Sequence, residues 1–269
     1  AYMNVPTAHY SAGDRAVGNV DDTIRHAVSS LAHLLLTTHD EARDRLIRSG
    51  QQAWRVHNVG HAGLDRIRAA PKLESKSLAA ALGVPEIVDP YLVVIQHPIS
   101  SEIAESKHQM HETLAAVAGL GLQTFVSHPN SDPGSMGIID EIKMFGLSPN
   151  IHVFKNIPDV PFVNLLCGAA VLVGNSSLGI LEAPYWGLPV VNVGLRQTDR
   201  RHAENVFFVP HIQKRISDQI RSILEDAAVR QKARTCSNPF GDGRTGERVA
   251  DLLASVPLDT KLLNKELTY

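Results

Sequence analysis

The feature that most constrains the fold is a regular alternation, from about residue 88 onward, of short apolar segments with helix-length amphipathic ones. The apolar segments have the β-branched composition of strands and are Tyr91–Gln96, Gln123–Ser127, Ile151–Phe154, Val171–Gly174, Pro189–Val193 and Val206–Val209. Strands that alternate with helices are joined by right-handed crossovers into a parallel sheet covered by helices on both faces. The pattern therefore predicts a doubly wound α/β domain.

The first 85 residues contain the pieces of a second α/β unit. Apolar residues at positions 24, 28, 31 and 35 have helical spacing and follow Asp21 and Asp22, which can cap a helix start. Residues 38–41 have the form of a capping box, so a second helix is expected from there to Gly50. Residues 55–59 read as a strand. Because these strands are too few to close a sheet and the chain begins at Ala1, we expect an incomplete domain with an upstream part missing.

A connection between two domains is predicted between residues 69 and 89, which are rich in proline and charge and carry little strand pattern. We place the boundary near residue 86. The predicted organisation is an incomplete domain over residues 1–85, a sheet domain over 86–235 and a tail over 236–269.

Composition argues against several classes of partner. The 269 residues carry 26 lysines and arginines against 28 acidic residues, with no block of like charge, so nucleic acid and anionic membranes are not expected partners. The longest apolar stretches are far shorter than the roughly 20 residues that span a bilayer. Cys167 and Cys236 lack metal-ligand spacing, and Cys167 lies in an apolar run typical of a buried thiol. We expect a protein of the reducing cytoplasm with no metal and no cofactor.

The segment Val171–Pro184 carries the most chemical information. A buried strand runs through small residues into a helix predicted to begin near residue 178, and these small residues are Gly174, Ser176, Ser177 and Gly179. Free backbone amides and the positive end of a helix dipole suit an anion, and small side chains let phosphate oxygens approach. Glu182 is placed to accept hydrogen bonds from a ribose diol. The segment favours a nucleoside diphosphate, although a tight turn with a serine cap explains the same residues without a ligand.

Other polar residues follow the predicted strands at the edge where open α/β sheets bind ligands. His97 follows the first strand, the loop His128–Ser135 follows the second, and Arg196 follows the strand that ends at Val193. Phe162, in the helix before the glycine-rich segment, is either a base-stacking residue or a core residue. These positions predict one functional rim formed by three loops.

A cluster of acidic and basic residues lies near the amino terminus. Asp14, Asp21 and Arg25 stand among glycines and histidines within residues 9–26. They are candidates for acid–base catalysis, and helix capping with surface charge is the competing interpretation. The histidines at positions 33, 39, 57, 61, 108, 111 and 202 are interpreted as structural, because no pair of them has the context of a metal site.

Together these segments resemble the hydrolysing branch of the UDP-N-acetylglucosamine 2-epimerase family. The resemblance covers nearly the whole chain, and its motifs are Ala1–His9, Gly18–Ala27, Gly60–Ile67, His97-Pro98, Pro129–Ser135, Gly174–Gly179, Glu182–Pro184, Arg196-Gln197 and Gly241–Gly243. It implies a GT-B architecture, in which two Rossmann-like domains face each other across a cleft. It also implies that the carboxyl-terminal domain holds most of UDP and that a last helix, within residues 236–269, crosses back to the first domain.

The resemblance implies roles for individual residues. Those implied to bind UDP are Ser176, Ser177, Gly179 and Arg196 at the diphosphate, Glu182 at the ribose and Phe162 at uracil. Asp21 matches the family's catalytic aspartate, His97 matches its cleft histidine, and Arg25 would support the same charge. In this family the C2 proton is removed, UDP leaves to give a 2-acetamidoglucal, and water adds with inversion at C2. Such an elimination needs a positioned base and an acid or cation for the leaving diphosphate.

Two features depart from the family pattern. The sialic-acid enzymes have a glutamate and then a glycine where this chain has Ser11 and Ala12. Serine cannot act as an acid or base near neutral pH, so either Asp14 substitutes, or the substrate is a variant sugar, or activity has been lost. The family's opening strand, its phosphate turn and a further catalytic aspartate would precede residue 1.

The expected function is hydrolysis of UDP-N-acetylglucosamine, or a related UDP-N-acetylhexosamine, to UDP and an N-acetylmannosamine-type sugar, by the whole enzyme or its larger part. The resemblance implies a homo-oligomer, dimer or tetramer, that acts in sialic or other nonulosonic acid synthesis. The alternatives are a catalytically impaired UDP-sugar-binding homologue and a GT-B glycosyltransferase.

Overall fold

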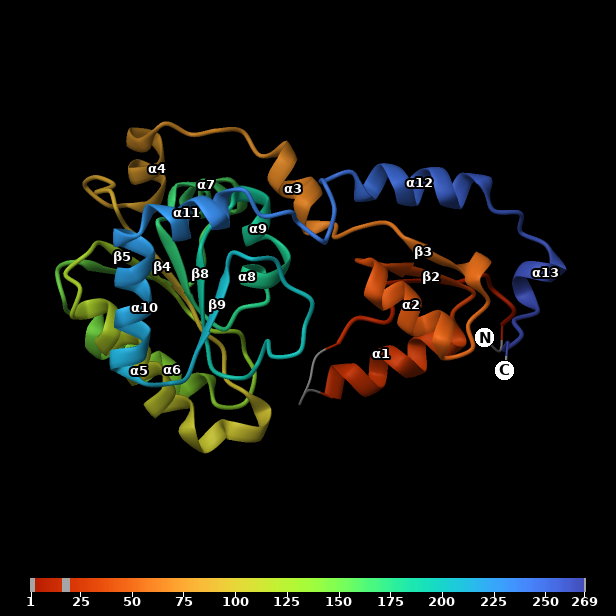
Figure 1. Cartoon of the computed structure of the whole chain (residues 1–269), viewed down its shortest axis with the longest axis horizontal. Helices are drawn as coiled ribbons and strands as arrows, with labels where there is room; N and C mark the ends of the chain where they lie inside the picture. Colours follow the sequence, from red (N-terminus) through yellow and green to blue (C-terminus); the bar gives the residue numbers. More distant parts are fainter. Residues whose placement is uncertain (1–2, 16–19, 269) are drawn as a thin grey trace. The chain divides into compact units, whose positions relative to one another are not determined.

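The computed structural model of the chain describes residues 3–15 and 20–268, and the chain forms two compact units (Figure 1). The first unit is made of Ala1–Ala69 with Asn238–Tyr269, and the second is Ala70–Ser237. Both units are built on parallel sheets with helices between the strands. The fold class is therefore α/β, as the alternation of apolar and amphipathic segments predicts.

The second unit contains a six-stranded parallel sheet with the order β6-β5-β4-β7-β8-β9. Its strands are β4 (Leu92–Ile95), β5 (Thr124–Ser127), β6 (Ile151–Phe154), β7 (Val171–Gly174), β8 (Val190–Val193) and β9 (Val206–Val209). All six lie within the segments predicted from sequence. The register pairs Ile95 with Gly174 at the carboxyl ends of the two central strands.

Helices cover both faces of this sheet (Figure 1). One face carries α5 (Ser106–Ala118), α6 (Ser135–Phe145) and α10 (Gln213–Glu225), and α5 contacts both of the others. The other face carries α7 (Asp159–Gly168), α8 (Leu178–Leu181) and α9 (Ala183–Trp186), against which α4 (Ser75–Leu82) and α11 (Ala227–Arg234) pack. A short 3-10 segment, η2 (Ser100–Glu105), joins β4 to α5.

The core of the second unit explains why its strands are easy to read from sequence. Every residue of β4, β7 and β8 is buried, since both faces of the sheet are covered. Strands buried on both faces are continuous apolar runs rather than alternating ones. Burying one valine or leucine side chain contributes about 1.5–3 kcal/mol, and the core of this unit is formed by side chains of the strands together with those of the helices that cover them.

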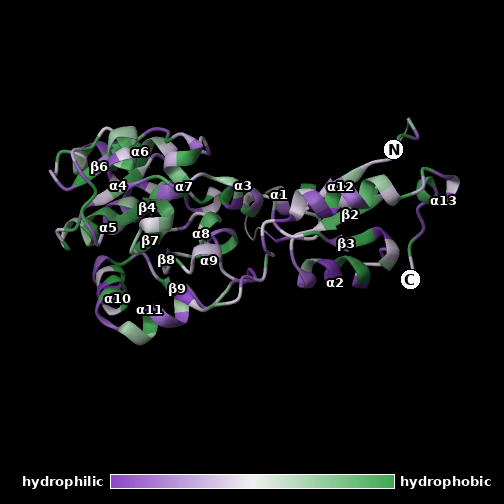
Figure 2. Ribbon diagram, turned by 90° about the horizontal axis from the view of Figure 1, so that it is seen from above, coloured by the Kyte–Doolittle hydropathy of each residue, from purple (hydrophilic) through white to green (hydrophobic). Residues whose placement is uncertain are grey.

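The first unit contains a three-stranded parallel sheet with the order β1-β2-β3. Its elements are β1 (Ala8–Tyr10), α1 (Val20–Leu31), β2 (Leu34–Thr37), α2 (Asp40–Arg48), η1 (Ala53–Arg55), β3 (Val56–Asn58), α3 (Gly63–Ala69), α12 (Thr245–Ser255) and α13 (Thr260–Leu263). Both hydrophobic and hydrophilic residues lie along α2, as expected for a helix with one buried face (Figure 2).

Three local expectations in the first unit were wrong. The helix α1 begins at Val20, so Asp21 and Asp22 lie in its first turn and do not precede it as caps. It ends at Leu31, and Leu35 lies in the buried strand β2 and not on the helix. The cap of α2 is His39, whose Nδ1 accepts a hydrogen bond from the Ala42 amide, whereas the Thr38 hydroxyl is buried without a partner in the described part of the chain. In the last two cases burial in the sheet outweighs the local helical pattern.

The carboxyl-terminal segment belongs to the first unit and is held there by a fully buried arginine. The Arg55 guanidinium donates hydrogen bonds to the backbone carbonyls of Lys261, Leu262 and Asn264 around the end of α13. The Lys265 ammonium in turn donates to carbonyls at the end of α1. These bonds satisfy helix-end carbonyls that have no partner within their own helix.

The structure divides the units after Ala69, whereas the sequence predicted a boundary near residue 86. Residues 70–85 join the second unit because α4 packs on α7 and because the Asn164 side chain bonds to the backbone of Pro71 and Leu73. Hydrogen bonds to a connecting segment cannot be read from its proline content. Cys167, predicted as a buried thiol, is exposed because it lies in the last turn of α7. Among the described residues, no helix combines the length and hydropathy needed to cross a membrane.

Candidate functional site

The centre of the candidate nucleotide site is the place where the strand order of the second unit reverses. The strands β4 and β7 are neighbours in the sheet, and the chain leaves them in opposite directions toward β5 and β8. Open α/β sheets bind ligands at such a switch point, beyond the carboxyl ends of the strands. His97 follows β4 and the segment Asn175–Ser177 follows β7, so both lie at this point.

A buried asparagine ties the loops of this edge together. Asn175 is fully buried. Its Oδ1 accepts a hydrogen bond from the His97 amide at 2.7 Å, and its Nδ2 donates to the His97 carbonyl at 2.8 Å. Its own carbonyl accepts hydrogen bonds from Arg196 Nη1 at 3.1 Å and Gln197 Nε2 at 2.9 Å. The loops that follow β4, β7 and β8 are therefore held by one residue.

Gly174 makes this close approach possible. Its φ is 128°, and a side-chain carbon at this position would lie 2.1 Å from the Ile95 carbonyl oxygen. Only glycine tolerates that backbone conformation and that contact. Gly179 has a different purpose, since a side-chain carbon there would lie 2.8 Å from the Val190 side chain on β8. Because glycine has no side chain, Gly179 allows close packing of α8 on the sheet. Its backbone amide donates a hydrogen bond to the Ser176 carbonyl.

The turn between β7 and α8 presents backbone amides at the carboxyl edge. Those of Ser176 and Ser177 donate to no other group within the described part of the chain. The helix begins at Leu178 as predicted, but α8 is a single turn, so its dipole is small. Glu182 lies half-buried between α8 and α9, and Phe162 is half-buried in α7. The local geometry offers amide donors for an anion, with the Glu182 carboxylate one turn away.

His97 is held neutral and in one tautomer. Burial, and then the positive charge of Arg196, lower the pKa of His97 to about 4. Its Nδ1 lies 3.1 Å from the Asn130 backbone nitrogen and accepts a hydrogen bond from that amide. The acceptor role at Nδ1 assigns the ring proton to Nε2. At neutral pH His97 is therefore a hydrogen-bond donor through Nε2, not a general base and not a cation.

The structure brings together the three loops that the sequence placed on one rim. His97 contacts the loop His128–Ser135 through Asn130, and Arg196 contacts the β7 loop through Asn175. Three residues of this rim, Asn175, Gln197 and Asn130, have no role that was predicted from the sequence. Asn175 stands inside the Gly174–Gly179 motif, and a polar residue between a buried strand and a buried helix is the signal that points to it.

The first unit has its own polar cluster at the carboxyl ends of its strands. Asp14 is 6% exposed, and its Oδ1 lies 3.6 Å from His39 Nε2. Since His39 Nδ1 accepts the hydrogen bond of the α2 cap, Nε2 carries the ring proton and faces the carboxylate. Phe240, from the carboxyl-terminal segment, packs edge-on to the His39 ring at 5.4 Å. His39, which the sequence analysis assigned to structure, thus pairs with a candidate catalytic residue.

The other candidates of the first unit surround this pair. Arg25 Nη1 donates to the Asp14 carbonyl at 3.2 Å, and Arg45 donates to the Gly13 carbonyl. Ser11 has a φ of 62°, a left-handed conformation that is uncommon for serine. Asp21 is the second residue of α1, but its side chain lies outside the described ones. Within residues 3–15 and 20–268, no group of three or more His, Cys, Asp or Glu side chains is arranged to hold a metal ion.

A doubly wound parallel sheet in one unit and a second parallel α/β unit in the same chain define the class of GT-B-like proteins. The family model for UDP-N-acetylglucosamine 2-epimerase matches residues 1–254, so the chain belongs to that family. This confirms the resemblance identified from the motifs.

Named relatives support the hydrolysing branch. The chain is 33% identical to the UDP-N,N'-diacetylbacillosamine 2-epimerase (hydrolyzing) of Legionella pneumophila, over 100% of this chain and 69% of the relative. It is 30% identical to the UDP-N-acetylglucosamine 2-epimerase of Neisseria meningitidis, over 79% of this chain and 55% of the relative. The chain therefore spans between about half and two thirds of the length of these enzymes.

Solved structures agree with the fold. The crystal structure of a Neisseria meningitidis UDP-GlcNAc 2-epimerase bound to UDP-GlcNAc matches 95% of this chain and 71% of its own, with a TM-score of 0.76 and 17% identity. A putative UDP-N-acetylglucosamine 2-epimerase from Listeria monocytogenes matches 94% of this chain and 68% of its own, with a TM-score of 0.73 and 17% identity. At this level of identity the likeness supports the GT-B-like fold.

Proposed function

We propose that this chain carries the nucleotide-binding part, and some of the catalytic groups, of an enzyme that hydrolyses a UDP-N-acetylhexosamine to UDP and a 2-epimeric N-acetylhexosamine. The observation that carries the proposal is the Asn175 junction, which holds His97, the Ser176–Ser177 amides and Arg196 at one switch point. Membership of the 2-epimerase family supports the reaction type.

The diphosphate is proposed to bind at the carboxyl edge of the second unit. The amides of Ser176 and Ser177, the Arg196 guanidinium and the Nε2–H of His97 are donors that suit phosphate oxygens. Glu182 is proposed to accept the ribose hydroxyls and Phe162 to contact uracil. Donors that bind the diphosphate also stabilise the charge it gains as it leaves C1.

The proton-transfer groups are proposed to come from the first unit. The C2 proton of the sugar is removed, the C1–O bond to UDP breaks, and water then adds to the 2-acetamidoglucal. Asp21 is proposed as a catalytic carboxylate, Arg25 as a supporting charge, and Asp14 as the carboxylate that takes over for the missing glutamate. The Asp14–His39 pair supports a fixed position for the Asp14 carboxylate, because the His39 Nε2–H faces its Oδ1.

The sugar is proposed to be a variant hexosamine and not N-acetylglucosamine itself. The Legionella pneumophila relative is named for UDP-N,N'-diacetylbacillosamine, and a Campylobacter jejuni relative, 28% identical over 208 residues, is named for the GDP- and UDP-linked forms of the same sugar. Ser11, at the position of the family's glutamate, gives a local reason to expect a substrate other than that of the sialic-acid enzymes. We propose that the released sugar is used in nonulosonic acid synthesis. We also propose that the enzyme is a homo-oligomer and acts in the cytoplasm.

The test is turnover of two substrates by this chain and by the full-length product of its gene. UDP-N-acetylglucosamine and UDP-N,N'-diacetylbacillosamine are incubated with each protein, and free UDP and the released sugar are followed by NMR. We expect UDP release with inversion at C2, faster with the second substrate. UDP binding without release of UDP from either sugar would reject the reaction and favour the impaired homologue that Ser11 suggests. Release that requires an added acceptor would indicate a glycosyltransferase.

A further inference from the structure

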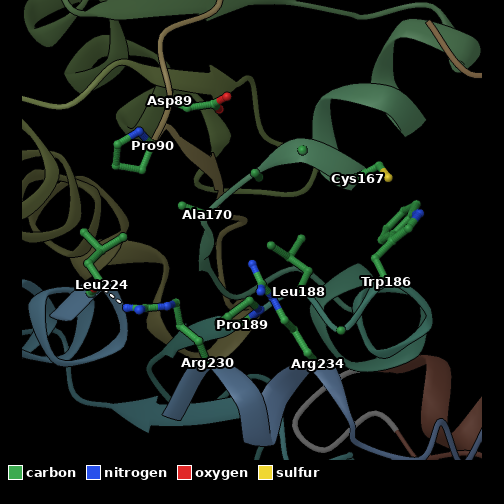
Figure 3. A pocket seen from close by; sticks show the side chains of 13 residues that line it. Asp89, Pro90, Cys167, Ala170, Trp186, Leu188, Pro189, Leu224, Arg230 and Arg234 are labelled. Carbon is green, nitrogen blue, oxygen red and sulfur yellow. Dashed lines mark hydrogen bonds between the residues drawn. The ribbon is translucent and has the colours of Figure 1, made fainter. Parts of the chain in front are cut away.

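The second unit has a pocket at the edge of its sheet opposite to the candidate nucleotide site. The pocket has a volume of about 500 Å³ and lies where β4, β7 and β8 begin. Pockets of 300–1,000 Å³ are the usual size for small-molecule ligands. Residues from the start of β4, the ends of α7 and α9, and α11 form its wall (Figure 3). Nothing in the proposed reaction uses this pocket.

The wall carries an excess of positive charge. Arg230 and Arg234, one turn apart on α11, line it together with a single acidic residue, Asp89 (Figure 3). Arg230 is occupied, since its Nη1 donates to the carbonyls of Ile223 and Leu224 at the end of α10. Arg234 makes no hydrogen bond or ion pair with another group in the described part of the chain. Its guanidinium points into the pocket beside Leu188 (Figure 3).

The positive charge of Arg234 in the last turn of α11 is favourable for that helix. This effect does not explain why the guanidinium points into the pocket. The other helices that end at the pocket have their own caps. Tyr91 donates its hydroxyl to the Leu165 carbonyl near the end of α7. Gly187, in the left-handed conformation, closes α9. Arg234 is exposed, and its guanidinium is therefore a donor on this wall to which the described residues supply no partner.

An aromatic and apolar surface lies beside the arginines. Trp186 is half-buried and lines the pocket, and Leu188 and Pro189 form the wall next to it. Cys167, with its exposed thiol, lies on the same side as Trp186 (Figure 3). An indole and a guanidinium on one small wall suit a ligand that has a flat apolar body and a negative group.

We propose that this pocket binds an organic anion with a planar body, whose anionic group pairs with Arg234 and whose body packs against Trp186. The ligand would occupy the amino ends of the strands, whereas the nucleotide would occupy the carboxyl ends. Binding at the two edges is therefore expected to be simultaneous, and the pocket is a second ligand site of this protein.

The test uses a matched pair of fluorescent probes. Anilinonaphthalene sulfonate is a planar aromatic anion, and N-phenyl-1-naphthylamine has the same rings without the sulfonate. The chain has two tryptophans, so Trp54→Phe leaves Trp186 as the one donor for energy transfer to a bound probe. We expect saturable transfer to the sulfonate probe, with an affinity at least about tenfold higher than that of the neutral probe. Saturating UDP should leave this transfer unchanged.

Two further variants in the Trp54→Phe background locate the anion. Arg234→Gln should lower the affinity for the sulfonate probe to that of the neutral probe. Lys232→Gln removes one positive charge from the same helix at an exposed position outside the pocket, and should have no effect. Bound probe should also protect the Cys167 thiol from iodoacetamide, measured by peptide mass spectrometry.

Three results would overturn the proposal. The first is equal affinity for the two probes in the parent protein. The second is unchanged sulfonate binding in Arg234→Gln with the melting temperature preserved. The third is displacement of the probe by UDP, which would assign the signal to the nucleotide edge.

Discussion

At the scale of single residues, His97 shows how burial sets chemistry. A histidine at the carboxyl edge of a sheet can be a base, an acid or a neutral donor. Burial and Arg196 lower its pKa, and the Asn130 amide occupies Nδ1, so the neutral Nε2–H donor is the form that remains at neutral pH. The side chain is thus suited to hold a phosphate oxygen and not to remove the C2 proton.

The first prediction concerns this titration. The ring of His97 should titrate near pH 4 in an NMR experiment with ¹⁵N-labelled protein, and the rate profile should show no step from His97 between pH 6 and 8. Because the folded pKa lies below the unfolded value of about 6.5, the unfolded chain binds more protons between pH 4 and 6.5. The contribution of His97 to stability is therefore complete above pH 6.5 and is lost as the pH falls toward 4. A midpoint near 6.5 for His97 would contradict this prediction.

A second prediction separates binding from catalysis. Glu182→Ala should weaken UDP binding by about tenfold through the lost ribose hydrogen bonds. Asp21→Asn should leave UDP binding nearly unchanged and remove turnover, because the carboxylate is proposed to act on the sugar and not on the nucleotide. Calorimetry with UDP and the NMR assay of UDP release measure the two effects. Equal losses of UDP affinity in both variants would reject this division of roles.

At the scale of elements, the strands β4 and β7 are joined by hydrogen bonds that the sheet itself does not supply. The ladder ends at the pair Ile95 and Gly174, and the Asn175 side chain continues the connection to the His97 backbone. The backbone carbonyl of Asn175 accepts hydrogen bonds from Arg196 and Gln197, and these bonds hold the loop that follows β8. The hydrogen bonds of the buried Asn175 therefore fix the loops after β4, β7 and β8 relative to one another.

The third prediction tests the junction. Asn175→Ala leaves the backbone amide and carbonyl of His97 without their partners. Each buried polar group that loses its hydrogen-bond partner lowers the free energy of unfolding by about 1–3 kcal/mol. We expect a lower free energy of unfolding and the loss of UDP binding, measured by denaturant titration and calorimetry. Asn150→Ala is the matched control, because Asn150 is exposed and its side chain makes, in the described part of the chain, one hydrogen bond, to the Gly121 carbonyl. Normal UDP affinity in Asn175→Ala would mean that the loops keep their positions without the junction.

At the scale of the whole molecule, the chain returns at its carboxyl terminus to the unit in which it began. The Arg55 guanidinium donates to three carbonyls around α13 and also to the His33 carbonyl and the Gln52 side chain. One side chain thus joins segments more than 200 positions apart in the sequence, since the separation of Arg55 and Leu262 is 207. The first unit has a small hydrophobic core around Leu35 and Leu46, and the second unit has a much larger one. We therefore expect the Arg55 contact to matter more to the stability of the first unit.

The fourth prediction follows from that separation. Arg55→Met should lower the stability of the first unit by about 3 kcal/mol or more, because several buried carbonyls lose their donor at once. Hydrogen exchange measured by mass spectrometry should increase in peptides of β1–β3 and α13, and peptides of β4–β9 should be unchanged. Arg43→Met, on α2 with 41% of its side chain exposed, is the control within the same unit. A uniform increase across both units would show that they unfold together.

The sequence by itself determined the class of the second unit and the family. The central strands β4, β7 and β8 are buried at every residue and are continuous apolar runs, so their positions are visible without any long-range information. The motifs Gly174–Gly179 and Glu182–Pro184 are local in the chain, and for that reason they could be recognised directly. The short strands of the first unit were less visible: β1 was not predicted, and β2 was read as the end of a helix, because Leu35 continues the spacing of Ile24, Val28 and Leu31.

Tertiary structure alone decided which polar groups meet. Asn175 pairs with His97 across 78 positions of sequence, His39 faces Asp14, and the segment before β4 joins the second unit through Asn164. The pocket with Arg234 and Trp186 also exists only after the strands and helices are assembled. Local periodicity reflects which face of an element is buried, whereas a hydrogen bond between distant segments depends on the packing of the whole sheet. The elements could therefore be read from the chain, and the chemistry of the site could not.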